Sequence, residues 1–376
     1  MSRVPTGPAG GAGAERDDRL RRLLTERQVV VCAGAGGVGK TSVAAALAIE
    51  AAAQGRRVVV LTIDPARRLA DALGLSGLPN VPHRIEGPWP GELHAAMLDT
   101  RATFDELIAR HAAGPDQVRR ILDNRFYRNI SHALSGTQEY MAAEKLHELH
   151  ASDRFELIVV DTPPTRQALD FLDAPEQLAR FLDHRVYRLL TGSGGRWSRT
   201  VGRAATAVVR TAGRLVGTAV LDDAVAFFAA FDGMEAGFRD RAEQVRTLLR
   251  SPSTAFVVVA GPQADTVAEA EFFLGQIAAE GVALGAVVAN RLLPRFGPAE
   301  ADDLAHLADA HAGTGLAELV ANLTELTAAA DAEDRILQRL APPSGAVPLV
   351  RVPLLDHDVH DLEALDQLRS HLFGGG

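Results

Sequence analysis

Eight residues near the amino terminus, Gly34–Thr41, read Gly-Ala-Gly-Gly-Val-Gly-Lys-Thr. They follow the apolar run Gln28–Ala33 and precede Ser42–Glu50, a segment of strong helix formers. A strand, a glycine-rich turn, Lys-Thr and a helix in this order are typical of a loop that binds a polyphosphate at the positive end of a helix dipole. We therefore expect the glycines to let backbone N–H groups point inward around phosphates. An ordinary turn between a strand and a helix is the alternative interpretation.

The pattern assigns a role to each residue of the loop. Lys40 is expected to reach the β- and γ-phosphates of a nucleoside triphosphate, and the Thr41 hydroxyl to coordinate Mg²⁺. Lys40 and Lys145 are the only lysines among 39 basic residues, which marks Lys40 as a position where a compact point charge is needed. The residues expected to bind the nucleotide here are Gly34, Gly36, Gly37, Val38, Gly39, Lys40, Thr41 and Ser42.

Composition limits the class of protein. The 376 residues are 47% hydrophobic, enough for a substantial α/β core, and the formal charge of −9 argues against a nucleic-acid partner. The single cysteine, Cys32, is expected to be a buried apolar side chain in a protein of a reducing compartment. We see no signal peptide and no run of about 20 apolar residues. The expected location is the cytoplasm, with peripheral association at a membrane as a second option.

Seven apolar runs, separated by segments of helical character, are the main guide to the fold. The runs are mostly unbroken, which is typical of strands buried on both faces of a mainly parallel sheet. We therefore expect an α/β fold with a doubly wound, mainly parallel sheet and a site at the carboxyl ends of its strands. The runs are Val29–Ala33, Val58–Ile63, Leu93–Leu98, Phe155–Val160, Ala255–Ala260, Ala286–Asn290 and Leu349–Val352.

Two long intervals without strand signals, about 100–152 and 174–251, are expected to be helical. Since they lie between apolar runs, we interpret them as a helical subdomain inserted into one nucleotide-binding domain over residues 18–376. Residues 1–17 are expected to form a disordered tail, because its start is rich in Gly, Pro and Ala. A short helix is expected over Asp18–Glu26.

Two aspartates follow predicted strands. Asp64, in Thr62–Ala66, is placed to orient an attacking water or to hold Mg²⁺, and capping a helix that begins at Pro65 is the alternative. Asp161 ends the apolar strand Phe155–Asp161 and is expected to hold Mg²⁺ directly or through water. A plain helix cap is again the alternative for Asp161.

The base preference is inferred from the end of the sixth predicted strand. Guanine-specific loops of this kind use Asn-Lys-x-Asp, whereas this strand ends in Asn290-Arg291-Leu292-Leu293. Asn290 can still hydrogen-bond an adenine edge. ATP with Mg²⁺ is therefore the expected ligand.

Together these residues resemble the ArsA family of ATPases, which includes the arsenite-pump ATPase and the eukaryotic ATPase that targets tail-anchored membrane proteins. The resemblance spans Gln28–Leu372. It implies ATP hydrolysis by a dimer, with Lys40 and Asp64 catalytic, Asp64 positioning the water, and Pro353 beside adenine. The matching stretches are Gly34–Thr41 (a deviant Walker A loop), Asp64–Ala66 (switch I), Asp161–Thr165 (switch II), Asn290, and Val352–Leu355 followed by Leu362–Leu365.

The chain departs from the family's pattern at Ala35, so it resembles a bacterial branch without the signature lysine. In the family a lysine there reaches the phosphates of the other subunit, and its loss should slow hydrolysis. A lysine-bearing paralogue in a heterodimer, which we favour over a homodimer, is one explanation. A substituting arginine is the second, from Arg67, Arg68 or Arg166, the last of which replaces a family glycine. Poor hydrolysis by a nucleotide-gated binder is the third.

The helical insert has two interpretations. Residues 201–231 are apolar, with Arg203, Arg210 and Arg214 on one face of an expected amphipathic helix, and Phe227, Phe228 and Phe231 add apolar surface. This helix either packs on the core or receives an apolar segment of a client. The resemblance implies the second role for the insert.

The resulting hypothesis is an ATPase whose nucleotide-gated dimer binds and releases a hydrophobic client segment or a membrane protein. A positioning ATPase of the ParA/MinD kind is one rival, which the charge of −9 disfavours for DNA. An ATPase subunit that energises a membrane anion pump is the other. Arsenite extrusion is not expected, because one cysteine cannot form a thiolate cluster.

Overall fold

The computed structural model describes residues 9–64, 66–125, 127, 137–163, 223, 226–227, 229–230, 234–296, 301–340 and 347–374. By its internal contacts the chain divides into two compact units. The first comprises residues 1–97, 153–168 and 250–376, and the second residues 98–152 and 169–249.

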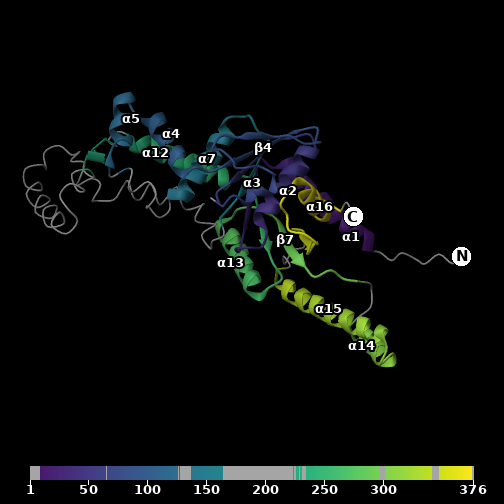
Figure 1. The fold of residues 1–376 in the computed structure, drawn as a ribbon. Helices are drawn as coiled ribbons and strands as arrows, with labels where there is room; N and C mark the ends of the chain where they lie inside the picture. Colours follow the sequence, from purple (N-terminus) through teal and green to yellow (C-terminus); the bar gives the residue numbers. More distant parts are fainter. Residues whose placement is uncertain are drawn as a thin grey trace, which may run out of the picture. The chain divides into compact units, whose positions relative to one another are not determined.

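The first unit is built on an eight-stranded sheet in the order β3-β4-β2-β5-β1-β6-β7-β8 (Figure 1). Neighbouring strands are parallel except for β3 and β4, which pair antiparallel at one edge. The strands are β1 (Val29–Gly34), β2 (Arg57–Thr62), β3 (His83–Ile85), β4 (Glu92–Met97), β5 (Leu157–Asp161), β6 (Thr254–Ala260), β7 (Leu284–Leu292) and β8 (Leu349–Pro353).

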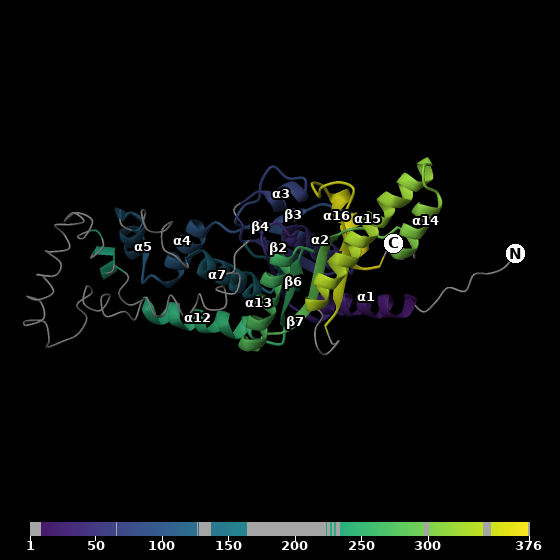
Figure 2. The ribbon, with the colours of Figure 1, turned by 90° about the horizontal axis from the view of Figure 1, so that it is seen from below.

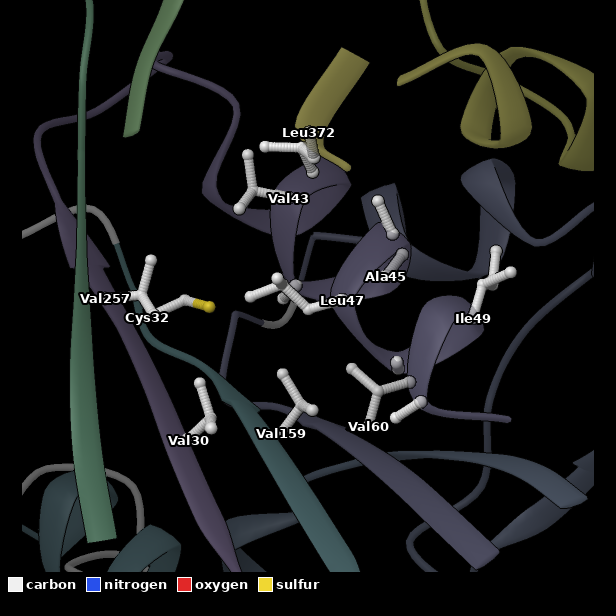
Figure 3. Close-up of a cluster of buried hydrophobic side chains, with 14 of the residues drawn as sticks. Val30, Cys32, Val43, Ala45, Leu47, Ile49, Val60, Val159, Val257 and Leu372 are labelled. Atoms are coloured by element: carbon white, nitrogen blue, oxygen red, sulfur yellow. The ribbon is translucent and has the colours of Figure 1, made fainter. Parts of the chain in front are cut away.

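The sheet is buried on both faces, as its unbroken apolar strands require. Val30 and Cys32 of β1 belong to the core beneath α2 (Lys40–Ala53), whereas Val29 and Val31 point to the opposite face and are equally inaccessible to solvent. Figure 3 shows Val30, Cys32 and Val159 facing Val43 and Leu47 of α2. Successive strand side chains therefore contribute to two apolar layers.

The helices of the first unit cover these layers. Helix α2 packs on β1, β2 and β5, α16 packs on α2 and β8, and α13 packs on β6, β1 and β7 (Figure 2). Besides α2, the described helices of the first unit are α1 (Ala9–Glu26), α3 (Arg68–Ala72), α13 (Ala264–Glu280), α14 (Ala301–Ala310), α15 (Gly315–Leu337), the 3₁₀ turn η2 (Gln338–Leu340) and α16 (Leu362–Leu372).

The predicted doubly wound, mainly parallel α/β sheet is confirmed. The seven predicted strands correspond to β1, β2 and β4 to β8. Strand β3 was missed because it has three residues, two of them exposed, and so carries no apolar run.

The first helix begins at Ala9, earlier than the predicted start at Asp18 and inside the stretch expected to be a tail. Asp17 is buried against Gly374 near the carboxyl end of the chain. Packing on α2 and β7 anchors α1 in the first unit.

A buried carboxylate joins three of these helices. Glu50 of α2 accepts hydrogen bonds from Arg21 of α1 at 3.0 Å and from Arg369 of α16 at 2.8 Å. Burial alone would raise the pKa of Glu50, but the hydrogen bonds from these two guanidinium groups outweigh burial and lower it. The carboxylate therefore stays charged and fixes α1 and α16 against α2.

The second unit is helical in its described part, which comprises α4 (Thr100–His111), α5 (Pro115–Leu122), α7 (Thr137–Ala151) and α12 (Glu235–Leu249). Most of the predicted amphipathic helix lies outside the described residues, as do Phe228 and Phe231. Phe227 is buried and stacks on Tyr127 with 5.9 Å between ring centroids, so it adds no exposed apolar surface. Among the described residues, no helix is both long and apolar enough to cross a membrane.

An ionic cluster holds the helices of the second unit together. The Glu144 side chain of α7 is 1% exposed and accepts hydrogen bonds from Arg241 of α12 at 2.8 Å and from Arg110 of α4 at 3.1 Å. Loss of this carboxylate would leave two guanidinium groups without their shared partner.

We expect Glu144→Gln to destabilise the second unit by about 3 kcal/mol, because breaking a buried ion pair leaves an uncompensated charge. Urea denaturation followed by helical circular dichroism measures the change. The matched control is Glu243→Gln, which breaks the exposed pair with Arg246 on α12 and should cost less than about 1 kcal/mol. Equal effects of the two substitutions would show that the buried pair contributes no more than the exposed one.

Candidate nucleotide-binding site

The candidate site lies where β1, β2, β5, β7 and β8 end at the same edge of the sheet. In the sheet, β5 and β2 lie on one side of β1, and β6 and β7 lie on the other. The strand order therefore reverses beside β1, which makes this position a topological switch point. Ligands of open α/β sheets bind at such a point. Loops that follow these strands line a pocket of about 450 Å³.

Close contacts require glycine at two positions, Gly34 at the end of β1 and Gly39 directly before α2. Gly34 has a φ of 151°, and a side chain there would place its Cβ 2.1 Å from the Val259 carbonyl oxygen of β6. Gly39 has a φ of 91°, and its Cβ would lie 2.3 Å from the Asn290 side-chain nitrogen. Both positions combine a left-handed backbone with a close neighbour, so only glycine fits them.

Lys40 begins α2 and lines the pocket with its side chain largely buried. Its Nζ donates to the Ala35 carbonyl oxygen at 2.7 Å. Burial lowers the pKa of Lys40, and the nearby charge of Arg68 lowers it further, while Asp161 and Asp64 act in the opposite direction. The ammonium group is thus held at the pocket by a neutral carbonyl rather than by a carboxylate.

Asp161 ends β5 and is fully buried behind Thr41. Its Oδ2 accepts hydrogen bonds from the hydroxyls of Thr41 and Thr62, each at 2.9 Å. Burial raises the pKa of Asp161 to about 6, against the effect of these hydrogen bonds and of Lys40. Its Oδ1 has no hydrogen-bond partner among the described residues.

This arrangement fits a hard divalent cation. A buried carboxylate oxygen without a donor calls for a partner, and Mg²⁺ prefers carboxylate, hydroxyl and water oxygens. Thr41 and Asp161, the two predicted metal ligands, are hydrogen-bonded to each other although they lie 120 positions apart in the sequence.

Asp64 lines the pocket from the loop that follows β2. Its Oδ1 accepts a hydrogen bond from the Ala66 N–H at 2.9 Å, which fixes the carboxylate within a turn. Helix α3 begins at Arg68 with Arg67 as its capping residue, so the interpretation of Asp64 as a helix cap is wrong. Pro65 lies outside the described residues.

Asn290 and Pro353 lie at the ends of β7 and β8 and both line the pocket. The Asn290 amide donates to the Val38 carbonyl oxygen at 2.9 Å and so supports the glycine-rich loop. The loop after β8 completes this side of the pocket with Leu354, Leu355, His357, Asp358, Val359 and His360.

Arg291 is a pocket residue that the sequence motifs did not predict. It has a φ of 64°, rare for a residue with a side chain, and its guanidinium donates to the Gly37 carbonyl oxygen at 2.8 Å. No local pattern marks an arginine that adopts a left-handed conformation, so the sequence carried no signal for it.

The structure brings most of the predicted site residues to one pocket. Its lining includes Gly37, Gly39, Lys40, Thr41, Ser42, Asp64, Asn290 and Pro353. Gly34 and Gly36 are not among the lining residues, and Val38 and Ala35 have buried side chains in the core below the loop. Within switch II, Pro164 and Thr165 lie outside the described residues, as does Arg166.

The sequence model of the ArsA ATPases, described as anion-transporting ATPase, matches residues 27–305. The chain belongs to the ArsA ATPase family. The match begins just before β1 and includes the loop from Gly34 to Thr41, Asp64, Asp161 and Asn290. The family resemblance drawn from the motifs is therefore confirmed.

Three proteins from other organisms are similar in sequence to this ArsA-family chain. A protein of Aquifex aeolicus named as an arsenical pump-driving ATPase is 21% identical over 358 residues, 92% of this chain and 79% of that protein. An uncharacterised protein of Streptomyces coelicolor is 33% identical over 278 residues, 73% of this chain and 64% of its own length. The ATPase GET3 of Malassezia globosa is 30% identical over 166 residues, 43% of this chain and 47% of that protein.

We expect Asn290→Ala to loosen the glycine-rich loop, because it removes the hydrogen bond to the Val38 carbonyl. The loss of about 1 kcal/mol corresponds to roughly fivefold faster amide exchange at Gly36–Gly39. Hydrogen exchange read by mass spectrometry measures it. Asn322→Ala, at an exposed position of α15, is the matched control and should leave the loop unchanged. Identical exchange in both variants would show that Asn290 does not support the loop.

Proposed function

We propose that this chain binds ATP with Mg²⁺ and hydrolyses its terminal phosphate. The observation that carries the proposal is the meeting of three groups in one place: the buried ammonium of Lys40, the Thr41–Asp161 pair, and the Asp64 carboxylate. One oxygen of Asp161 has no hydrogen-bond partner in the described part of the chain. This set combines a phosphate-binding cation, oxygen ligands for a metal and a group that orients water.

Each residue has a defined part in this proposal. Lys40 exchanges its bond to the Ala35 carbonyl for contacts with the β- and γ-phosphates, while the backbone N–H groups of the loop surround the phosphate oxygens. Thr41 and Asp161 hold Mg²⁺, which when bound neutralises charge on the β- and γ-phosphate oxygens. Asp64 accepts a hydrogen bond from the attacking water and orients it.

We assign the adenine end of the nucleotide to the side of the pocket formed by the ends of β7 and β8. Asn290 and Pro353 line the pocket there, with Leu354 and Leu355. Leucine and proline side chains supply an apolar wall for a flat ring, and the carbonyl of Asn290 is the natural acceptor for an adenine amino group. The amide nitrogen of Asn290 is already bound to Val38.

Lys40→Ala and Asp64→Asn should separate binding from hydrolysis. Lys40→Ala should abolish ATP·Mg²⁺ binding, measured by titration calorimetry, because no other lysine lies in the described part of the pocket. Asp64→Asn should keep the ATP affinity but lower kcat at least about 100-fold, because an amide orients water poorly.

Two controls test this assignment. Asp71→Asn changes another carboxylate of the same pocket and should retain activity. Arg22→Ala removes an exposed cation of α1 and should leave binding unchanged. Unaltered ATP affinity in Lys40→Ala would reject the phosphate site.

We further propose that ATP gates a dimer that binds and releases a hydrophobic client segment. Support comes from family membership and from the separate helical unit inserted between strands of the ATPase core. The partner subunit is either a second copy or a lysine-bearing paralogue, since the buried Ala35 offers no charge to a neighbouring site. Metalloid transport is disfavoured, because Cys32 is the only cysteine and burial raises the pKa of its thiol.

A fusion protein that carries one carboxyl-terminal apolar segment of about 20 residues is the probe for client binding. We expect it to co-elute with the full chain, or with the chain and its paralogue, in one nucleotide state and to be released in the other. The same fusion with two arginines inside the segment is the control. Failure to co-elute with either ATP or ADP would reject the client role and leave the ATPase proposal standing.

A further inference from the structure

Arg68 is a pocket residue whose charge has no partner among the described residues. It is the first residue of α3 and lines the pocket together with Asp64 and Asp71. The side chain is exposed and forms no hydrogen bond or ion pair with any described residue. Guanidinium groups elsewhere in the described chain are frequently paired with carboxylates, as in Arg21–Glu50 and Arg241–Glu144.

The position of Arg68 brings a second cation toward the same space as Lys40. Lys40 and Arg68 both line this pocket, so the ammonium and the guanidinium share the space that a ligand would occupy. Two cations in one pocket repel each other, and a polyanion bound between them would relieve that repulsion more fully than the Asp64 and Asp71 carboxylates that also line it. A triphosphate supplies that anion, and a planar guanidinium suits bidentate contact with phosphate oxygens.

The other candidates for an additional cation are less suitable. Arg67 donates to the Ser76 carbonyl oxygen at 3.5 Å and is not among the pocket residues. Arg291 is held by the Gly37 carbonyl oxygen at 2.8 Å. Ala35 carries no charge and its side chain lies in the hydrophobic core.

On the basis of the proposed ATPase function, we propose that Arg68 contacts the γ-phosphate and stabilises its developing negative charge from within the same subunit. In this step the water oxygen forms a bond to the γ-phosphorus. The bond between that phosphorus and the bridging oxygen breaks, and its electron pair stays on ADP. Inorganic phosphate forms and one water proton passes to solvent. Arginines that act on this charge, from the same or a partner subunit, accelerate such reactions about 10³- to 10⁵-fold.

The test compares Arg68→Ala with Arg67→Ala, a substitution of the adjacent exposed arginine outside the pocket. We expect Arg68→Ala to lower kcat about 1,000-fold with ATP affinity reduced no more than about tenfold, measured with a fluorescent ATP analogue. Arg67→Ala should behave as the wild type. Arg68→Lys should recover only part of the rate, because it keeps the charge but loses the planar fork. Free guanidinium ion at millimolar concentration should raise the kcat of Arg68→Ala but not that of the wild type or of Arg67→Ala. A purely structural role of Arg68 would not produce this effect.

The outcomes separate the two proposals. Absence of ATP binding by the wild type would overturn the proposed function itself. A wild type that binds ATP but turns over only with a lysine-bearing partner would reject the role of Arg68 and keep the ATP site. Wild-type kcat in Arg68→Ala would reject it as well. Circular dichroism confirms that each variant is folded.

Discussion

The Asp161 carboxylate organises the site, since three separate segments meet on it. One of its oxygens binds the hydroxyls of Thr41 at the start of α2 and Thr62 at the end of β2, while Asp161 itself ends β5. A fully buried carboxylate is costly unless it is hydrogen-bonded, so these contacts fix the ends of two strands and a helix relative to one another. The second oxygen stays unpaired among the described residues and is the element that makes the cluster suitable for Mg²⁺.

The glycine-rich loop is held from its other side by β7. Asn290 binds the Val38 carbonyl and Arg291 binds the Gly37 carbonyl, so adjacent residues of one strand support adjacent residues of the loop. Glu50 links α2, which follows this loop, to α16, which follows the pocket-lining loop after β8.

The sequence predicted the fold more fully than the details of the site. Buried strands such as Val58–Ile63 were visible because a parallel sheet covered on both faces needs continuous apolar runs. The edge strand His83–Ile85 and the early start of α1 were not visible. The strand is short and mostly polar, and the first turns of α1 are rich in glycine, which disfavours a helix. In the site, Lys40 and Thr41 were visible from their spacing, whereas Arg291 had no signal because its left-handed backbone is imposed by its neighbours.

The amino-acid sequence by itself determined the strand–loop–helix unit around Gly34–Thr41, because glycines, lysine and threonine at fixed spacing act within one short segment. Only the tertiary structure decided which distant groups join it. Asp161 reaches Thr41 across 120 positions and Asn290 reaches Val38 across 252. It also decided that Arg68 rather than its neighbour Arg67 lines the pocket. Side-chain direction depends on how helices and strands pack, and no local pattern contains that information.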